Sequence, residues 1–228
     1  MSFLKIKKTP ANLANETSYR QIVRLSCPVR ELTWKNTKWN LIRTTAVSIF
    51  CISDELFIFA KVFAIMKEKG IEELFYAVRR LKEENEDFVL DLAGFFEDIY
   101  KKQVEELEQL GIAHFYGFQS DPRPFYTEAD CVVLPSYHEG MSNVLLEAAA
   151  TGRPVITSNI PGCRESVENG KSGLLVEVKN KEMLYQAMKK MLHCSREERE
   201  KMGKAGREKM KREFRKEAVV ERTVRSLK

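Results

Sequence analysis

The feature that most constrains this chain is a short apolar segment followed by a polar turn and then by strong helix formers. The apolar segment is Cys131–Leu134, which is partly β-branched and suits a buried strand. Pro135 cannot donate a hydrogen bond to a neighbouring strand, so the strand is expected to end there. Ser142 is a favourable N-cap, residues 144–150 favour a helix, and Gly152 suits the left-handed conformation that often ends one. The sequence therefore predicts a strand, a turn and a helix in close succession.

This predicted turn has the features of an anion site. A helix that begins at Ser142 leaves about four backbone amides without partners at its start, and its dipole places positive charge there. The amides belong to Ser142, Asn143, Val144 and Leu145. Phosphate binds at such helix starts, and Glu147 would then be placed to accept hydrogen bonds from the sugar of a nucleotide. Glu139 would reach a group beyond the phosphates. The alternative is that both glutamates are ordinary solvated residues.

Around this motif, apolar strands alternate with amphipathic helices. The predicted strands cover residues 56–60, 88–93, 112–116, 131–134, 154–158 and 173–178. The predicted helices cover residues 70–84, 97–110, 123–129, 142–150 and 181–192, and a capping box at 195–198 begins another. This alternation predicts an α/β fold over residues 51–228, a Rossmann-like parallel sheet with helices on both faces. Ligands bind at the carboxyl ends of such strands, where the turns at Gly94, Gly117 and 135–141 are expected.

The central stretch resembles the retaining glycosyltransferases of family 4, whose signature is two glutamates with seven residues between them. Residues 139–156 read EGMSNVLLEAAATGRPVI. Flanking matches are HFYGF at 114–118, FYTEADCVVLPS at 125–136, PGCRE at 161–165 and NGKSGLLV at 169–176. The resemblance runs from about residue 66 to the end. It implies one half of such an enzyme, the C-terminal, donor-binding half of a GT-B fold.

The resemblance also implies roles for individual residues. Glu139 takes the place of the catalytic glutamate beside the transferred sugar, and Glu147 that of the ribose ligand. The positions implied to contact the rest of the donor are Gly117 and Phe118 near the base, His138 near the sugar, Gly140 and Met141 near sugar and phosphate, and the amides of Ser142, Asn143, Val144 and Leu145.

The cationic side chains that bind the diphosphate in this family are matched only in part. Lys69 in Lys69-Gly70 matches the lysine of the family pattern, but the arginine expected five residues earlier falls on Ala64. An alignment with a three-residue insertion places Lys61 there instead. Lysine lacks the bidentate fork of arginine, so either alignment implies a weaker grip on phosphate.

Residues 1–50 show no sustained periodicity and are expected to form an irregular or poorly ordered basic segment. They hold nine Lys or Arg against two acidic residues, while the whole chain carries a net charge of +5. Such a segment favours anionic surfaces, which points to peripheral contact with the inner face of a membrane as one alternative and a solvated extension as the other. The sequence has no nucleic-acid motif, so nucleic acid is not expected as a partner.

Composition favours a cytoplasmic protein without a cofactor. No apolar run approaches the 18 residues that a membrane span needs. The five cysteines lack paired spacing and are interpreted as free thiols in a reducing compartment. The three histidines lack ligand spacing and no D-x-D motif is present, so neither a metal nor another cofactor is expected.

The function expected from the resemblance is binding of a nucleotide sugar for retaining transfer. The donor would be a UDP-hexose or UDP-N-acetylhexosamine, and the acceptor a glycan or a lipid-linked glycan, as in polysaccharide biosynthesis. Two alternatives stay open. One is a truncated, inactive nucleotide-sugar-binding remnant, and the other is the donor subunit of a two-chain enzyme whose partner subunit supplies the acceptor domain.

Overall fold

The computed structural model describes residues 56–62, 64–95, 97–215, 219–220 and 224–225. These residues belong to one compact unit, Ser53–Lys228. The basic segment 1–50 lies outside the described residues, and with it lie the predictions of its irregular structure and membrane contact. No helix in the described ranges is both long and apolar enough to cross a bilayer.

The core of the unit is a six-stranded parallel sheet in the order β3-β2-β1-β4-β5-β6. The strands are β1 (Phe57–Val62), β2 (Phe88–Ala93), β3 (Ala113–Phe115), β4 (Cys131–Leu134), β5 (Val155–Ser158) and β6 (Gly173–Val176). The order runs outward from β1 in one direction and from β4 in the other. The carboxyl ends of these two strands therefore border a topological switch point, where doubly wound sheets bind ligands.

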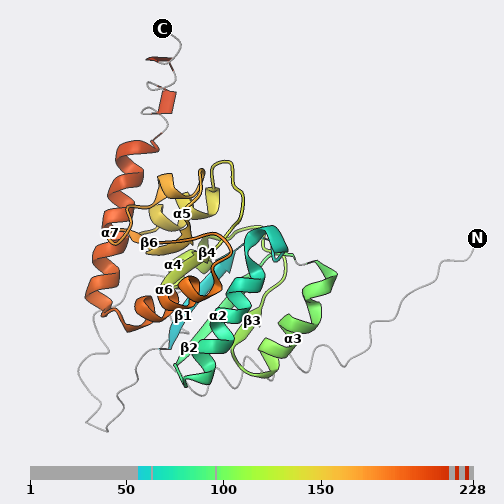
Figure 1. Ribbon diagram of the computed structural model, residues 1–228. Coiled ribbons are helices and arrows are strands. Elements are labelled where there is room, and N and C mark those ends of the chain that lie inside the picture. The colour runs from blue at the N-terminus through green and yellow to red at the C-terminus, as the bar shows by residue number, and fades with distance from the viewer. Residues whose placement is uncertain (1–55, 63, 96, 216–218, 221–223, 226–228) are drawn as a thin grey trace, which may run out of the picture. The chain divides into compact units, whose positions relative to one another are not determined.

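Helices cover both faces of the sheet, which confirms the predicted α/β fold (Figure 1). The helices are α2 (Ile71–Glu83), α3 (Lys101–Gln109), α4 (Arg123–Glu128), α5 (Asn143–Ala150), α6 (Lys181–His193) and α7 (Arg196–Glu213). Short 3-10 turns lie at η2 (Lys67–Lys69), η3 (Asp98–Tyr100) and η4 (Arg164–Ser166). One apolar core lies between the sheet and α2, α3 and α6, and a second lies under α4 and α5. Alternate residues of β1 supply the two cores, since successive side chains in a strand point to opposite faces.

Several element ends differ from the prediction. Strand β1 continues to Val62 because it pairs with β2 along its full length, with Lys61 opposite Leu92. Strand β6 ends at Val176 rather than at residue 178, and its pairing with β5 also ends there. The helix predicted from residue 97 begins as the 3-10 turn η3 before α3. The capping box of α7 forms as predicted, with Ser195 and Glu198 bonding each other's backbone amides.

Two glycines hold the switch-point loops in place by close backbone contact. Gly70 has φ +67°, and a Cβ there would lie 2.0 Å from the carbonyl oxygen of Pro135. Gly162 has φ +86°, and a Cβ there would lie 1.9 Å from the carbonyl oxygen of Gly140. Any other residue would strain the backbone and push these loops apart. The loop between β4 and α5 is thus fixed on two sides by segments far away in the sequence.

Candidate functional site

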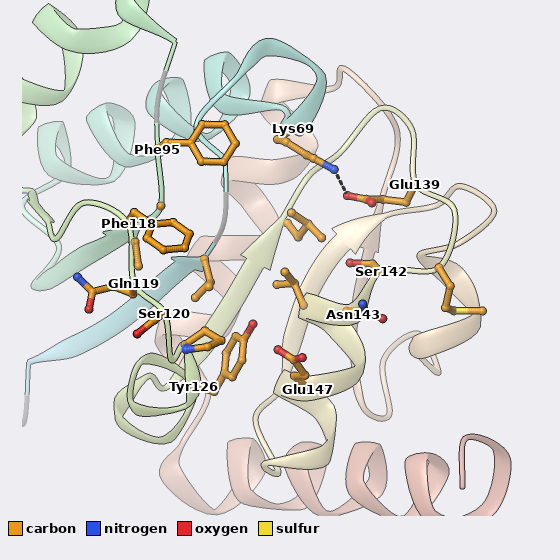
Figure 2. Close-up of a pocket in the computed structure, with 17 residues that line it drawn as sticks. Lys69, Phe95, Phe118, Gln119, Ser120, Tyr126, Glu139, Ser142, Asn143 and Glu147 are labelled. Carbon is orange, nitrogen blue, oxygen red and sulfur yellow. Dashed lines mark hydrogen bonds and ion pairs between the residues drawn. The ribbon is translucent and has the colours of Figure 1, made fainter. Parts of the chain in front are cut away.

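A pocket of about 440 Å³ lies at the switch point, and eight of the predicted site residues line it (Figure 2). The lining includes Lys69, Phe118, Glu139 and Met141. It also includes Ser142, Asn143, Val144 and Glu147. The volume lies within the range of small-ligand sites. The fold therefore brings together residues that are up to 78 positions apart in the sequence.

Glu139 is held at one end of the pocket by two hydrogen bonds. The Nζ of Lys69 donates to its Oε1 at 2.7 Å, and the Oγ of Ser136 donates to the same oxygen at 2.8 Å. The side chains of Lys69 and Glu139 are only 19% and 13% exposed, so solvent screens this ion pair less than a surface pair. The carboxylate group of Glu139 is therefore held in place beside the amine of Lys69, where Figure 2 shows the two side chains meeting.

The backbone amides at the start of helix α5 agree only partly with the prediction. Ser142 is the N-cap residue of α5, but its side chain makes no capping hydrogen bond. Its amide donates to the carbonyl oxygen of Gly162 at 3.1 Å, so the prediction of a free amide at Ser142 is wrong. The amides of Asn143, Val144 and Leu145, in the first turn, have no carbonyl partner within the helix. Three amides rather than four are thus available for an anion.

Glu147 lies at the other end of the pocket, opposite Tyr126 of α4. Tyr126 is not among the residues predicted from the sequence, because a six-residue helix is too short to show a periodic face. Its residue exposure is 0%, yet it lines the pocket. Burial, and after it the negative charge of Glu147 and a hydrogen-bond interaction with that carboxylate, raise the pKa of Tyr126 well above the usual value, so the hydroxyl keeps its proton at neutral pH.

Two aromatic side chains form one wall of the pocket. Phe118 was predicted and is 72% exposed, while Phe95 was missed and is 52% exposed. Phe95 directly follows Gly94, whose position at the carboxyl edge of the sheet was the available signal. Gly117 does not line the pocket, but its carbonyl accepts a hydrogen bond from the Gly94 amide at 2.8 Å, which joins the two turns. An exposed aromatic wall of this kind suits the flat face of a base.

Lys61 lies inside β1 and does not line the pocket. Its residue exposure is 0%, and its Nζ has no hydrogen-bond partner among the described residues. Burial, and after it the nearby charge of Lys69, lower the pKa of Lys61 to about 7, while the charge of Glu139 opposes the shift. The predicted phosphate cation is therefore a buried amine beneath the site. Ala64, the alternative position, is also buried, at 1% exposure.

The remaining predicted residues lie outside the pocket lining. His138 and Gly140 are both exposed in the β4–α5 loop, on either side of Glu139. The side chain of Leu145 is buried in the core under α5, so only its amide is relevant to a ligand. Among the described residues, no group of three or more His, Cys, Asp or Glu side chains gathers in the way of a metal site.

Comparison with known proteins places this chain in a family. Residues 48–209 match the family model "Glycosyl transferases group 1". The chain is similar to the capsular polysaccharide biosynthesis glycosyltransferase CapM of Staphylococcus aureus, at 29% identity over 163 residues, which cover 69% of this chain and 42% of CapM.

Solved structures agree on the fold. Sucrose-phosphate synthase from Thermosynechococcus elongatus superposes with a TM-score of 0.66 at 27% identity, covering 76% of this chain and 46% of that one. HepE of Anabaena, in complex with UDP, superposes with a TM-score of 0.64 at 20% identity, covering 75% of this chain and 48% of HepE. This chain therefore spans less than half the length of these relatives. The family match, the six-stranded sheet and the two glutamates that line the pocket agree, and the chain belongs to the glycosyl transferases group 1 family.

Proposed function

We propose that this chain is the C-terminal, donor-binding half of a retaining glycosyltransferase that takes a UDP-hexose or UDP-N-acetylhexosamine. The observation that carries the proposal is the arrangement of one pocket around the start of α5, with Glu139 at one end and Glu147 at the other. The free amides of the first helical turn lie between them. A nucleotide diphosphate has a matching order of groups, with the ribose on one side of the phosphates and the sugar on the other.

The chemistry of donor cleavage explains the charges of the site. Breaking the bond between the sugar and the diphosphate leaves additional negative charge on the departing phosphate, which fixed dipoles and cations must stabilise. The amides of α5 and the ammonium of Lys69 supply such groups, so the proposed reaction needs no metal ion. Glu139 would lie near the anomeric carbon, and Glu147 would accept hydrogen bonds from the ribose. The aromatic wall of Phe95 and Phe118 would take the base.

The acceptor belongs to a part of the reaction that this pocket does not supply. Retaining transfer requires the acceptor hydroxyl to be held close to the anomeric carbon, on the face that the phosphate leaves. The proposed acceptor is a glycan or a lipid-linked glycan, because CapM functions in capsular polysaccharide biosynthesis. An acceptor domain, in the same protein or on a separate subunit, would position that hydroxyl.

A thermal-shift panel with UDP, GDP, ADP and their sugars tests donor binding. A ligand that binds only the folded state raises its stability by RT ln(1 + [L]/Kd), so UDP and its sugars should raise the melting temperature most. Glu147→Ala should weaken UDP binding by about 1.5 to 3 kcal/mol, the value of hydrogen bonds to a charged group, while Glu139→Ala should not weaken it. The proposal fails if no nucleotide shifts the melting temperature, or if both variants lose UDP affinity equally.

A further inference from the structure

The hydroxyl of Tyr126 is a buried polar group that faces Glu147 but makes no hydrogen bond of good geometry among the described residues. Among the described residues, four side chains carry a buried nitrogen or oxygen atom that makes no hydrogen bond: Lys61, Tyr126, Arg153 and Ser158. Of these four residues, only Tyr126 lines the pocket. Leaving a buried hydroxyl unpaired is unfavourable for folding, and proteins satisfy nearly all such groups. A hydroxyl that faces a pocket is satisfied when a ligand fills that pocket.

The surroundings of this hydroxyl restrict what that ligand group is. The ring of Tyr126 is fixed in the apolar core under α4 and α5, so the hydroxyl has little freedom to turn elsewhere. Figure 2 shows it facing Glu147, at the end of the pocket away from the ion pair of Lys69 and Glu139. A phosphate would be repelled by Glu147. A group that both donates and accepts hydrogen bonds fits a protonated hydroxyl and a carboxylate side by side.

We propose that Tyr126 recognises the ribose of the nucleotide donor: its hydroxyl donates to one oxygen of the 2′,3′-diol while Glu147 accepts from the diol. This inference rests on the proposed function, because it assigns the Tyr126 end of the pocket to the ribose. It adds a second ribose contact, from α4, that the paired-glutamate motif does not contain. The diol would give the tyrosine hydroxyl the well-formed hydrogen bond that it lacks among the described residues.

The test is the Tyr126→Phe variant of the full chain, titrated calorimetrically with UDP, 2′-deoxy-UDP and 3′-deoxy-UDP. The wild-type protein should bind UDP more tightly than at least one of the deoxy nucleotides. The variant should lose about five- to tenfold in UDP affinity, the value of one hydrogen bond, and should no longer distinguish UDP from that deoxy nucleotide. Without ligand, its melting temperature should change little, because the hydroxyl makes no hydrogen bond of good geometry among the described residues.

Tyr100→Phe is the matched control. Tyr100 is also buried, at 1% exposure, but its hydroxyl donates to Glu72 at 3.2 Å and it does not line the pocket. Removing the Tyr100 hydroxyl should lower the melting temperature and leave the affinity for all three nucleotides unchanged. The opposite responses of the two variants separate a ligand contact from a structural one.

Three results overturn the inference in distinguishable ways. If the wild-type protein binds no uridine nucleotide, the proposed function fails and the Tyr126 assignment fails with it. If the wild-type protein distinguishes the ribose hydroxyls and Tyr126→Phe does so equally well, only the assignment fails. If the variant weakens all three nucleotides by the same factor, Tyr126 shapes the pocket without contacting the ribose.

Discussion

At the scale of single residues, Lys61 is the least expected feature of the site. A lysine in the interior of a central strand loses its hydration, and the structure gives its amine no hydrogen-bond partner among the described residues. The carboxylates on the first turn of the neighbouring helix α2 are engaged elsewhere, since Glu72 accepts from Tyr100 and Glu73 accepts from Tyr137. The charges that act on Lys61 are those of Lys69 and Glu139. The amine is therefore poised to lose its proton near neutral pH.

We predict that Lys61 makes folding stability depend on pH above neutrality. Its pKa is about 7 in the folded protein against 10.5 for an ordinary lysine, so between these values the unfolded chain binds more protons. The free energy of unfolding should therefore gain a contribution from this group as the pH rises from about 7 to 10. Lys61→Met should remove that contribution and raise the unfolding free energy at pH 6 by about 1 to 3 kcal/mol. Urea unfolding of both proteins across this range is the measurement, and parallel pH profiles would contradict the prediction.

We predict that Glu139 competes with the donor for Lys69. The ion pair at 2.7 Å occupies the cation that the diphosphate would use. Glu139→Gln removes the competing charge and should tighten UDP binding by about 0.5 to 1 kcal/mol, while any donor cleavage should slow. Calorimetric titration with UDP measures the first effect. Glu128→Gln, an exposed carboxylate on α4 outside the pocket lining, is the charge-matched control. Equal UDP affinity in both variants would show that Lys69 is already available.

At the scale of elements, the prediction was accurate where a single stretch of sequence determines the structure. The order of strand, proline, polar loop and helix at residues 131–150 is local, and it forms as expected. It was incomplete where distant segments meet. The amide of Ser142 is taken by Gly162, and Tyr126 reaches the pocket only because α4 packs beside α5. The burial of Lys61 depends on full pairing with β2, which the uneven apolar pattern after residue 60 did not reveal.

We predict that Gly162 is required for the shape of the β4–α5 loop, and Gly170 provides the comparison. Both have positive φ, at +86° and +76°, but a Cβ at Gly170 would meet no atom within 4 Å, whereas one at Gly162 would collide with Gly140. Gly170→Ala should cost about 1 kcal/mol of unfolding free energy from backbone strain alone. Gly162→Ala should cost about 2 kcal/mol or more and should also weaken UDP binding. Chemical unfolding and nucleotide titration of both variants test this prediction. A similar loss of unfolding free energy in the two variants would mean that the loop adjusts to a Cβ at position 162.

At the scale of the whole molecule, the chain spans 42% of the length of CapM, and the proposed function assigns the described pocket to donor binding alone. We therefore predict that the isolated chain binds the donor but transfers little sugar, because positioning the acceptor contributes several kcal/mol to catalysis. The measurement is product formation from a labelled nucleotide sugar with free and lipid-linked glycans. Slow hydrolysis of the donor is the expected activity, with and without acceptor. Glycoside formation near 1 per second would show that this chain builds its own acceptor site.

The strand order has one more consequence, which concerns cooperativity. Strand β1 pairs with β2 over six residue positions but with β4 over only two, Phe59 with Cys131 and Ala60 with Val132. This is the shortest pairing in the sheet and is called the seam between its two halves. The pocket straddles the seam, with Lys69 contributed by one half and Glu147 by the other. A bound nucleotide would contact both halves of the sheet and hold them together. Amide hydrogen exchange at β1 and β4 should slow in proportion to nucleotide occupancy, because opening the seam would require the ligand to leave first.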